Sequence, residues 1–323
     1  MSSKTILTGI QPSGALHLGN YFGAAKKMVA LQDAGDCYLF IANYHALTTV
    51  HEADVLRDWT FQLAVDYLAL GIDPERTVLY RQSDVPEVQE LTWLLSNVIN
   101  VGFLQTGTSY KDKVAKGIIP SVGLFNYPVL MASDILCYDS DLVPVGRDQA
   151  QHLEFTRRMA RAFNHRYGEV LRVPEALIDE ETALVPGTDG GKMSKSLGNT
   201  IPVFLKGKKL KKALGQIVTD STPLEEPKDP DNCNVMALYK LFASQDEVTE
   251  LAGRYRAGNF GYGHAKLALQ EVMERELGEA WARRDALMAA PEKVEAILQA
   301  GAERARVRAR AVLDRALKAC GIR

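Results

Sequence analysis

The chain has 323 residues, which is the length of one or two domains. Its composition, 46% hydrophobic and 24% charged, excludes a disordered tail, a collagen-like repeat and a coiled-coil rod. A net charge of −2 excludes a wholly electrostatic nucleic-acid binder, although residues 201–323 are positive, with 21 basic and 17 acidic residues.

The cysteines and the N-terminus indicate the compartment. Cys37, Cys137, Cys233 and Cys320 form no C-x-x-C pair, so we expect no protein-ligated metal and no iron–sulfur cluster. The N-terminus has no apolar targeting core, and the sequence contains no apolar run long enough to span a membrane. We therefore expect a reduced, cytoplasmic protein with no membrane partner.

Strands and helices alternate along the first part of the chain. The pattern predicts strands at 5–8, 37–42, 77–80 and 142–145, and helices at 18–32, 52–70, 86–100 and 148–167, with a further helix ending near 138. This alternation predicts an α/β fold, a Rossmann-like parallel sheet with right-handed crossovers.

The pattern becomes helical after about residue 201, with almost no strand signal. We therefore expect a catalytic domain at 1–205 and an all-helical domain at 206–323. Trp59, Trp93 and Trp281 occur at helical spacing and are predicted to lie in the core.

A first constellation runs from Gly9-Ile-Gln-Pro-Ser-Gly14 to His17-Leu-Gly-Asn20. It predicts a strand, a tight turn and a helix, an arrangement that presents free N–H groups to phosphate at the carboxyl end of a parallel strand. Gly19 would let a nucleotide approach the backbone, and His17 could donate to a phosphate oxygen. The alternative is a glycine-rich turn with a packed histidine.

A second constellation, Gly190-Gly-Lys-Met-Ser-Lys-Ser196, puts Lys192 and Lys195 in a loop of small residues. The lysines could meet a polyphosphate, and the glycines would let the loop close on a bound nucleotide. A solvated basic loop is the alternative reading.

The two constellations, in this order and about 170 residues apart, resemble the HIGH and KMSKS signatures of class I aminoacyl-tRNA synthetases. Asn20 replaces the last residue of the first signature, a common variant in the tryptophan branch of that class. The segments Asp134-Ile-Leu-Cys-Tyr-Asp139 and Val143-Pro-Val-Gly-Arg-Asp-Gln149, followed by His152, narrow the resemblance to bacterial tryptophanyl-tRNA synthetases.

The resemblance implies an ATP site, with ATP as a substrate accompanied by Mg²⁺. Its catalytic residues would be His17, Lys192, Lys195 and Lys113, of which Lys113 is equally compatible with a solvated surface. Its ATP-binding residues would be Gln11, Pro12, Ser13, Gly19, Asn20, Gly146, Arg147, Asp148, Val185, Lys192, Met193, Ser194, Lys195 and Ser196. Among these, Gly146 and Asp148 would meet the ribose, and backbone near Val185 the adenine.

The resemblance also implies a tryptophan pocket centred on Asp134. This residue lies in an apolar helical stretch, where a carboxylate is costly to bury without a partner, and the family gives it the indole N–H. The other pocket residues would be Tyr127, Met131, Val143, Val145, Gln149, Leu7, Gly9 and His45. His45 is equally compatible with a core histidine, and Leu7 stands where relatives often have a stacking Phe.

The implied function is ligation of tryptophan to tRNA through tryptophanyl-adenylate, so the partners would be L-tryptophan, ATP and tRNA(Trp). A homodimer would form through residues of about 90–140, and the helical domain would recognise the anticodon, with Lys206–Lys212 a candidate for tRNA phosphate contacts or simply a solvated face. Three alternatives stay open: a tyrosyl-tRNA synthetase, a nucleotidyltransferase, and a synthetase-like paralogue that binds tryptophan or its adenylate as a partner protein.

Overall fold

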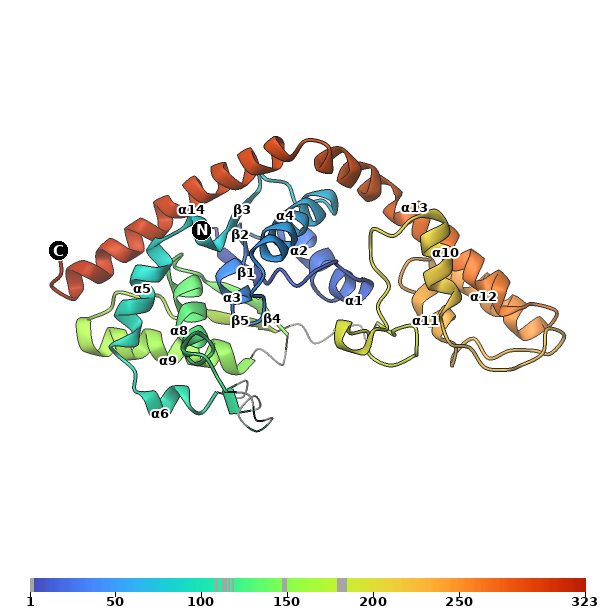
Figure 1. Ribbon diagram of the computed structural model, residues 1–323, viewed down its shortest axis with the longest axis horizontal. Coiled ribbons are helices and arrows are strands. Elements are labelled where there is room, and N and C mark those ends of the chain that lie inside the picture. Colours follow the sequence, from blue (N-terminus) through green and yellow to red (C-terminus); the bar gives the residue numbers. More distant parts are fainter. Residues whose placement is uncertain are drawn as a thin grey trace.

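Five parallel strands lie at the centre of the N-terminal part (Figure 1). The computed structural model describes residues 3–107, 110–111, 115, 117, 119–146, 150–178 and 185–323. The strands are β1 (Thr5–Ile10), β2 (Asp36–Ile41), β3 (Thr77–Arg81), β4 (Leu142–Val145) and β5 (Glu175–Ile178). Their order is β3-β2-β1-β4-β5, which confirms the predicted fold class. Only β5 was not predicted, because its sequence, Glu-Ala-Leu-Ile, has a single β-branched residue and no aromatic residue.

The helices surround this sheet and form the C-terminal part. They are α1 (Leu18–Asn20), α2 (Lys26–Leu31), α3 (Asn43–Ala46), α4 (Ala53–Ala69), α5 (Glu87–Ser96), α6 (Val101–Leu104), α8 (Val122–Leu136), α9 (Ala150–Tyr167), α10 (Gly207–Gly215), α11 (Asn234–Tyr239), α12 (Gln245–Ala257), α13 (Tyr262–Met288) and α14 (Pro291–Ala319). A π-helical turn, η1 (Tyr21–Ala25), joins α1 to α2, and short 3₁₀ turns are η2 (Gln82–Asp84) and η4 (Lys195–Leu197). The predicted helices therefore agree with the structure within a few residues.

Both faces of the sheet are covered. Successive side chains of a strand point to opposite faces, and in β2 Leu39 and Ile41 join one hydrophobic cluster while Tyr38 and Phe40 join another. The first cluster includes α4 and the helices of the C-terminal part, and the second includes α5, α8 and α9. Parallel strands buried on both faces read as continuous apolar runs, which is why β2 and β3 could be predicted from the sequence.

The last helix returns to the sheet. In Figure 1, α14 (red) runs from the C-terminal lobe back across the N-terminal part. It packs along β3, the edge strand, and Gly301 lies so close to that strand that a Cβ atom would be 1.8 Å from the Leu79 carbonyl oxygen. Arg81, at the end of β3, donates to Glu295 at 2.5 and 2.7 Å. Thus α14 belongs to the predicted helical tail in sequence but covers the edge of the sheet in space.

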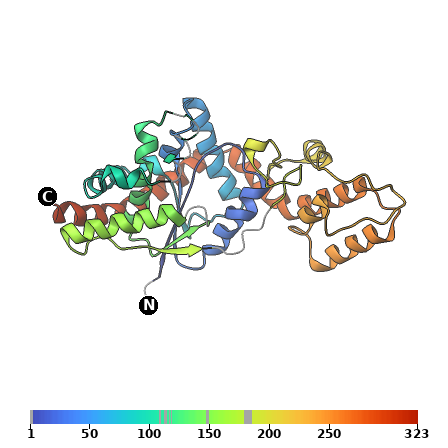
Figure 2. The ribbon, with the colours of Figure 1, turned by 90° about the horizontal axis from the view of Figure 1, so that it is seen from below.

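The other tail helices form a lobe at one end of the molecule (orange in Figures 1 and 2). This lobe is attached to the N-terminal part by α13. The Arg284 guanidinium donates to the buried Asp66 carboxylate of α4 at 2.6 Å, and the Trp281 indole N–H donates to the Val203 carbonyl at 2.8 Å. The first hydrophobic cluster contains buried residues from both sides of residue 205. Among the described residues, the two predicted domains therefore share one hydrophobic core.

The three tryptophans differ in burial. Trp281 is buried as predicted and Trp59 is half-buried, but Trp93 is 70% exposed, so the prediction that it lies in the core is wrong. The reason is the orientation of α5, which buries Val88, Leu91 and Leu95 on one face and turns Trp93 to the other.

Two negative observations concern the described part of the chain. None of its helices combines the length and apolar character needed to cross a membrane. All four cysteines are free thiols.

We expect Gly301→Ala to destabilise the fold, because the added methyl group meets the backbone of β3, which no side-chain rotation can relieve. The expected loss is about 1–3 kcal/mol of unfolding free energy. Gly278→Ala in α13 is the matched control, since nothing lies within 4 Å of its Cβ position and alanine favours a helix. Thermal melting checks this: the first variant should melt below the parent protein and the second at or above it.

Candidate active site

A cavity of about 600 Å³ opens at the carboxyl ends of β1, β2 and β4. In doubly wound parallel sheets this edge is where ligands bind. Nine of the predicted site residues line it: Leu7, Gly9, Gln11, His45, Tyr127, Met131, Asp134, Val143 and Gly146. The fold thus brings together residues that are up to 139 positions apart in the sequence.

The cavity is lined by Asp134, a residue that is 2% exposed. Its Oδ2 atom is 2.8 Å from His45 Nε2, and the Gln82 side-chain amide donates to Oδ1 and Oδ2 at 2.8 and 2.9 Å. Burial raises the pKa of Asp134 above its ordinary value, and the hydrogen bonds from His45 and Gln82 oppose that rise. Asp134 therefore has two hydrogen-bond partners within the protein. The sequence predicted His45 as a pocket residue but not as a partner of Asp134, and it did not indicate Gln82 at all.

The apolar wall of the cavity includes Leu7, Gly9 and Phe40. Phe40 comes from β2, and its ring occupies the space above Gly9, where a Cβ atom would be 2.2 Å from Phe40 Cζ. An aromatic ring is thus present next to the Leu7 position, supplied by the neighbouring strand. Tyr127 and His152 also line the cavity, with Tyr127 Oη 2.5 Å from His152 Nε2.

The first sequence constellation surrounds His17, which is 7% exposed and caps α1. Its Nδ1 accepts from the Asn20 backbone N–H at 3.3 Å, and the Asn20 side chain accepts from the His17 N–H at 3.3 Å. Because Nδ1 is an acceptor, the neutral ring carries its proton on Nε2. Burial, and secondarily the charge of Lys195, lower the pKa of His17 to about 4.

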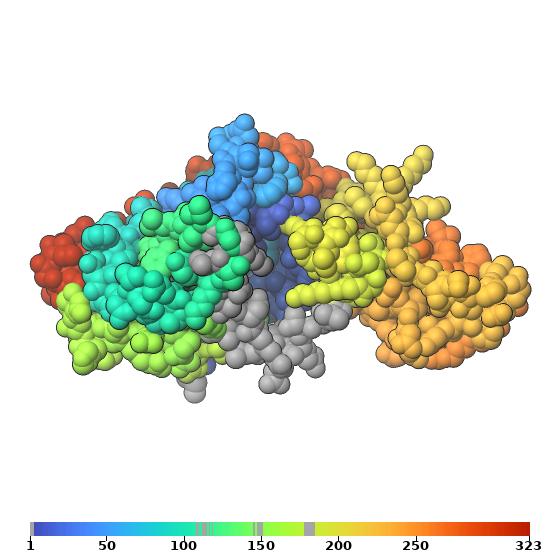
Figure 3. Space-filling model, turned by 60° about the horizontal axis from the view of Figure 1, so that its bottom comes forward, coloured from blue at the N-terminus to red at the C-terminus, as the bar shows by residue number. Residues whose placement is uncertain are grey.

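The second constellation packs against the first. Leu18 N–H donates to the Ile201 carbonyl and Val203 N–H to the Leu16 carbonyl, both at 2.9 Å, so the segment after the lysine loop runs beside the first motif. Figure 3 shows this stretch of the chain (yellow-green) next to the N-terminal part (blue). Within the loop, Lys195 Nζ donates to Ser13 at 2.7 Å (carbonyl) and 3.2 Å (hydroxyl).

Buried residues anchor the lysine loop. Met193 is 5% exposed, and its sulfur accepts from the Gly19 N–H at 3.3 Å. Asn199, a residue that sequence reasoning missed, is 3% exposed, accepts from Ser194 N–H at 2.8 Å and donates to the Lys192 carbonyl at 3.1 Å. The loop is therefore fixed at its buried positions, while Lys192 is exposed and Lys195 reaches Ser13 of the first constellation.

The other predicted residues are buried, exposed, or outside the described part of the structure. Pro12 and Val185 are buried, while Gln11, Ser13, Lys192 and Ser196 are exposed beside the two loops. The residues Lys113, Arg147, Asp148 and Gln149, and the side chain of Val145, lie outside the described part of the structure.

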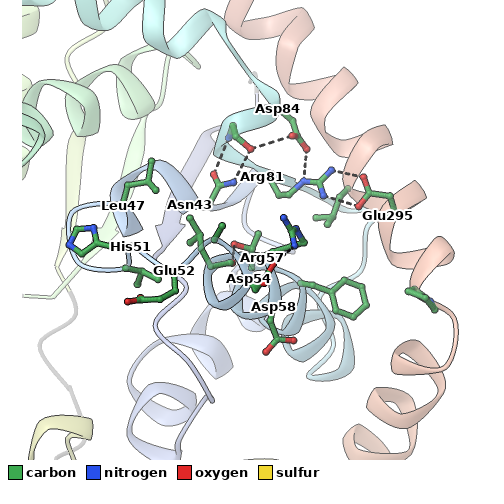
Figure 4. A pocket seen from close by; sticks show the side chains of 18 of the residues that line it. Asn43, Leu47, His51, Glu52, Asp54, Arg57, Asp58, Arg81, Asp84 and Glu295 are labelled. Carbon is green, nitrogen blue, oxygen red and sulfur yellow. Dashed lines mark hydrogen bonds and ion pairs between the residues drawn. The ribbon is translucent and has the colours of Figure 1, made fainter.

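A larger cavity, of about 1070 Å³, lies elsewhere, between α3, α4 and the start of α14 (Figure 4). None of the predicted site residues lines it. Figure 4 shows Arg81 between Asp84 and Glu295 at the upper edge of this cavity. The acidic residues Glu52, Asp54 and Asp58 are labelled below them. Size alone does not make it the site, because neither sequence constellation reaches it.

A parallel sheet with a HIGH-like turn and a KMSKS loop packed together defines a class I aminoacyl-tRNA synthetase. Residues 2–278 match the family described as tRNA synthetases class I (W and Y). The chain is 52% identical over 320 residues to the tryptophan–tRNA ligase of Fusobacterium nucleatum, covering 99% of this chain and 98% of that protein. It is 50% identical over 318 residues to that of Rhodopirellula baltica, covering 98% and 99%.

A solved structure agrees. The tryptophanyl-tRNA synthetase of Campylobacter jejuni, complexed with ADP and tryptophan, has a TM-score of 0.95 and 48% identity, covering 98% of this chain and 99% of that one. The chain belongs to the tryptophan–tRNA ligase family. The predicted family and class of enzyme are thereby confirmed.

We expect His17 to titrate near pH 4, because its imidazole is buried and, secondarily, because it lies near the Lys195 ammonium. Since the folded-state pKa is below the ordinary value of 6.5, His17 stays neutral through physiological pH, and its protonation destabilises the fold as pH falls below about 6.5. NMR titration of the ring protons measures this. Lys195→Ala should raise the pKa of His17, whereas Lys192→Ala, the matched control in the same loop, should leave it in place.

Proposed function

We propose that the chain activates L-tryptophan with ATP and then transfers it to tRNA(Trp). The observation that carries this proposal is the cavity at the strand ends, which is lined by both the buried Asp134 carboxylate and Gln11. Gln11 lies two residues before Ser13, on which Lys195 rests. One cavity therefore joins a site for a ring N–H to a site for phosphates.

In the amino-acid pocket, Asp134 would accept the indole N–H of tryptophan. A phenylalanine side chain offers no such donor and would leave a buried carboxylate short of a partner, which discriminates by a factor of about 10⁴ in sites built this way. Tyr127, Met131, Val143 and Leu7 would enclose the indole. Val145, Gln149, Gly9 and His45 would complete the pocket.

The nucleotide would lie along the two packed loops. Its phosphates would meet Ser13, Gly19, Asn20 and the two lysines, its ribose Gly146 and Asp148, and its adenine the backbone at Val185. Among the described residues no group of three or more His, Cys, Asp or Glu could hold a metal ion. Mg²⁺ would therefore enter as Mg·ATP, bound through the phosphates and neutralising part of their charge.

The reaction needs no nucleophile from the protein. A carboxylate oxygen of tryptophan attacks the α-phosphorus of ATP, the bond to the β-phosphate oxygen breaks, and tryptophanyl-adenylate and pyrophosphate result. A ribose hydroxyl of the tRNA end then attacks the activated carbonyl, and AMP leaves. The chain's contribution is to position the reactants and to place donors, His17 Nε2–H and the ammonium groups of Lys192 and Lys195, where phosphate charge accumulates. Lys113 would join them.

The division of labour follows the fold. Residues 1–205 would carry the chemistry and residues 206–323 would recognise the anticodon, with α14 serving the sheet rather than the tRNA along the length that packs on β3. Reduced thiols at all four cysteines suit a cytoplasmic setting.

A homodimer would form through α5, α6 and the start of α8. This region exposes Trp93 (70%), Val101 (62%), Ile119 (93%) and Val122 (83%), apolar side chains that water disfavours. Sedimentation velocity at micromolar concentration should give a dimer, and the double change Trp93→Asp and Val122→Asp should shift it to monomer. A monomeric parent protein would remove this part of the proposal.

Amino-acid-dependent pyrophosphate exchange, run with each of the twenty amino acids, tests the activation step. Tryptophan alone should support exchange, and Asp134→Ala should lose the preference for tryptophan over phenylalanine while the KM for ATP changes little. Exchange with tyrosine would point to the tyrosyl alternative. Charging of tRNA(Trp) must accompany exchange, because a paralogue that only binds or activates tryptophan would fail there.

The lysines of α10 test the role of the tail. Lys208, Lys209, Lys211 and Lys212 are exposed, while Leu210 and Leu214 anchor the helix. Changing all four lysines to Gln should raise the KM for tRNA roughly tenfold and flatten its salt dependence, because each lost phosphate contact removes counterion release. Pyrophosphate exchange needs no tRNA and serves as the control. Equal loss of both reactions would assign the lysines to folding instead.

A further inference from the structure

Gln82 lies behind the cavity rather than in it. It begins the 3₁₀ turn η2 after β3, is 1% exposed, and does not line the pocket that contains Asp134. A buried amide must find hydrogen-bond partners for its donor and acceptor groups, so the partners of Gln82 indicate its role.

The side chain of Gln82 connects two parts of the site. Its Nε2 donates to Asp134 Oδ1 at 2.8 Å and to Oδ2 at 2.9 Å. Its Oε1 accepts from the backbone N–H of Tyr44 at 3.0 Å and of His45 at 3.4 Å. The backbone donors fix which end of the amide faces the carboxylate: Oε1 must point to α3, so only N–H groups point to Asp134.

This arrangement determines which carboxylate oxygen a ligand can use. Oδ2 accepts from both Gln82 and His45, whereas the described contacts of Oδ1 are with Gln82 alone. A carboxylate oxygen has two lone pairs, so Oδ1 keeps acceptor capacity. Since the carboxylate is held at both oxygens, its plane is fixed before a ligand arrives, and a fixed acceptor loses less entropy on binding.

We infer that Gln82 is a positioning residue for tryptophan recognition: it orients the Asp134 carboxylate so that Oδ1 faces the indole N–H, and it places His45 through the backbone of α3. The inference rests on the proposed function. It adds to that function a residue that the substrate does not touch.

A purely structural role for Gln82 can be separated from this one. The helix α3 is also held by Asn43, whose amide donates to Ser83 Oγ at 2.8 Å and accepts from the Ser83 N–H at 3.1 Å. Loss of Gln82 therefore leaves α3 attached to η2. Asn43 and Ser83 both line the larger cavity, in which Figure 4 labels Asn43.

Gln32 provides a matched control. It is also a buried glutamine, 7% exposed, and its amide makes four hydrogen bonds, donating to the Val29 and Gly71 carbonyls and accepting from Asp73 N–H and Thr77 Oγ. None of these partners lines the cavity. The two glutamines thus tie the fold similarly, but only one touches Asp134.

The first experiment compares Gln82→Met with Gln32→Met. Gln82→Met should raise the KM for tryptophan roughly 10- to 100-fold, the range expected for a hydrogen bond to a charged group. Its ratio of kcat/KM for tryptophan to that for phenylalanine should fall, with the KM for ATP unchanged. Gln32→Met should leave all three at the parent values, although both variants should lower the melting temperature.

The second experiment is the pH profile of Gln82→Glu. Two carboxyl groups at this distance hold one proton between them, and the shared proton reproduces the donation of the amide. As pH rises the proton leaves and the charges repel. Compared with the parent protein, kcat/KM for tryptophan should be within about threefold at pH 6 and at least about tenfold lower at pH 8.5. Gln32→Glu should show no such pH-dependent loss.

The outcomes are distinct. If the parent protein neither binds tryptophan in calorimetry nor supports exchange, the proposed function is wrong and this inference falls with it. If the parent is active and Gln82→Met matches it in tryptophan KM and selectivity, only the inference is overturned. It is also overturned if the two Met variants lose activity equally, or if Gln82→Glu shows a flat pH profile relative to the parent.

Discussion

The structure depends on a constraint of parallel sheets, which must be covered on both faces and protected at their edges. The N-terminal part supplies α4, α5, α8 and α9, but these helices alone do not cover the sheet. One hydrophobic cluster is completed by helices of the C-terminal lobe, and the edge strand β3 is covered by α14, with Gly301 against Leu79. The part of the chain that we assign to tRNA is therefore also part of the framework that holds the chemistry in place.

Within that framework, the site separates its charges. At one end, a buried carboxylate is held by neutral or shared donors, so it can accept a further hydrogen bond without a permanent counter-ion. At the other, burial and, secondarily, the charge of Lys195 keep His17 neutral by lowering its pKa, and the contact with Asn20 leaves the ring proton on Nε2. In both places, hydrogen bonds within the protein fix the orientation of a polar side chain. Preorganisation of this kind is what a reaction without a protein nucleophile requires.

The sequence predicted the strands with long apolar runs, the helices and the two loops, because each leaves a local pattern. It also predicted nine residues that line the cavity, since these lie inside or beside recognisable motifs. It missed Gln82 and Phe40, whose roles depend on partners from distant segments: Gln82 and Asp134, for example, are 52 positions apart. It also missed Asn199, although the partners of Asn199 lie in the same loop. Trp93 was misassigned because helical spacing shows that a face exists but not which face meets the core. Long-range pairing is the information that local pattern does not contain.

The return of α14 has a consequence for how the chain is made. The ion pair between Arg81 and Glu295 joins residues 214 positions apart, and Gly301 meets β3 across a similar separation. During synthesis the strands emerge first, and β3 stays an uncovered edge, able to pair with another strand, until α14 leaves the ribosome. The edge of the sheet is thus covered only after residues 291–319 have been translated, and nascent chains that stop before them would expose an edge that promotes aggregation. Protection of β3 is therefore late relative to its synthesis, because the helix that covers it follows more than 200 residues later in the chain.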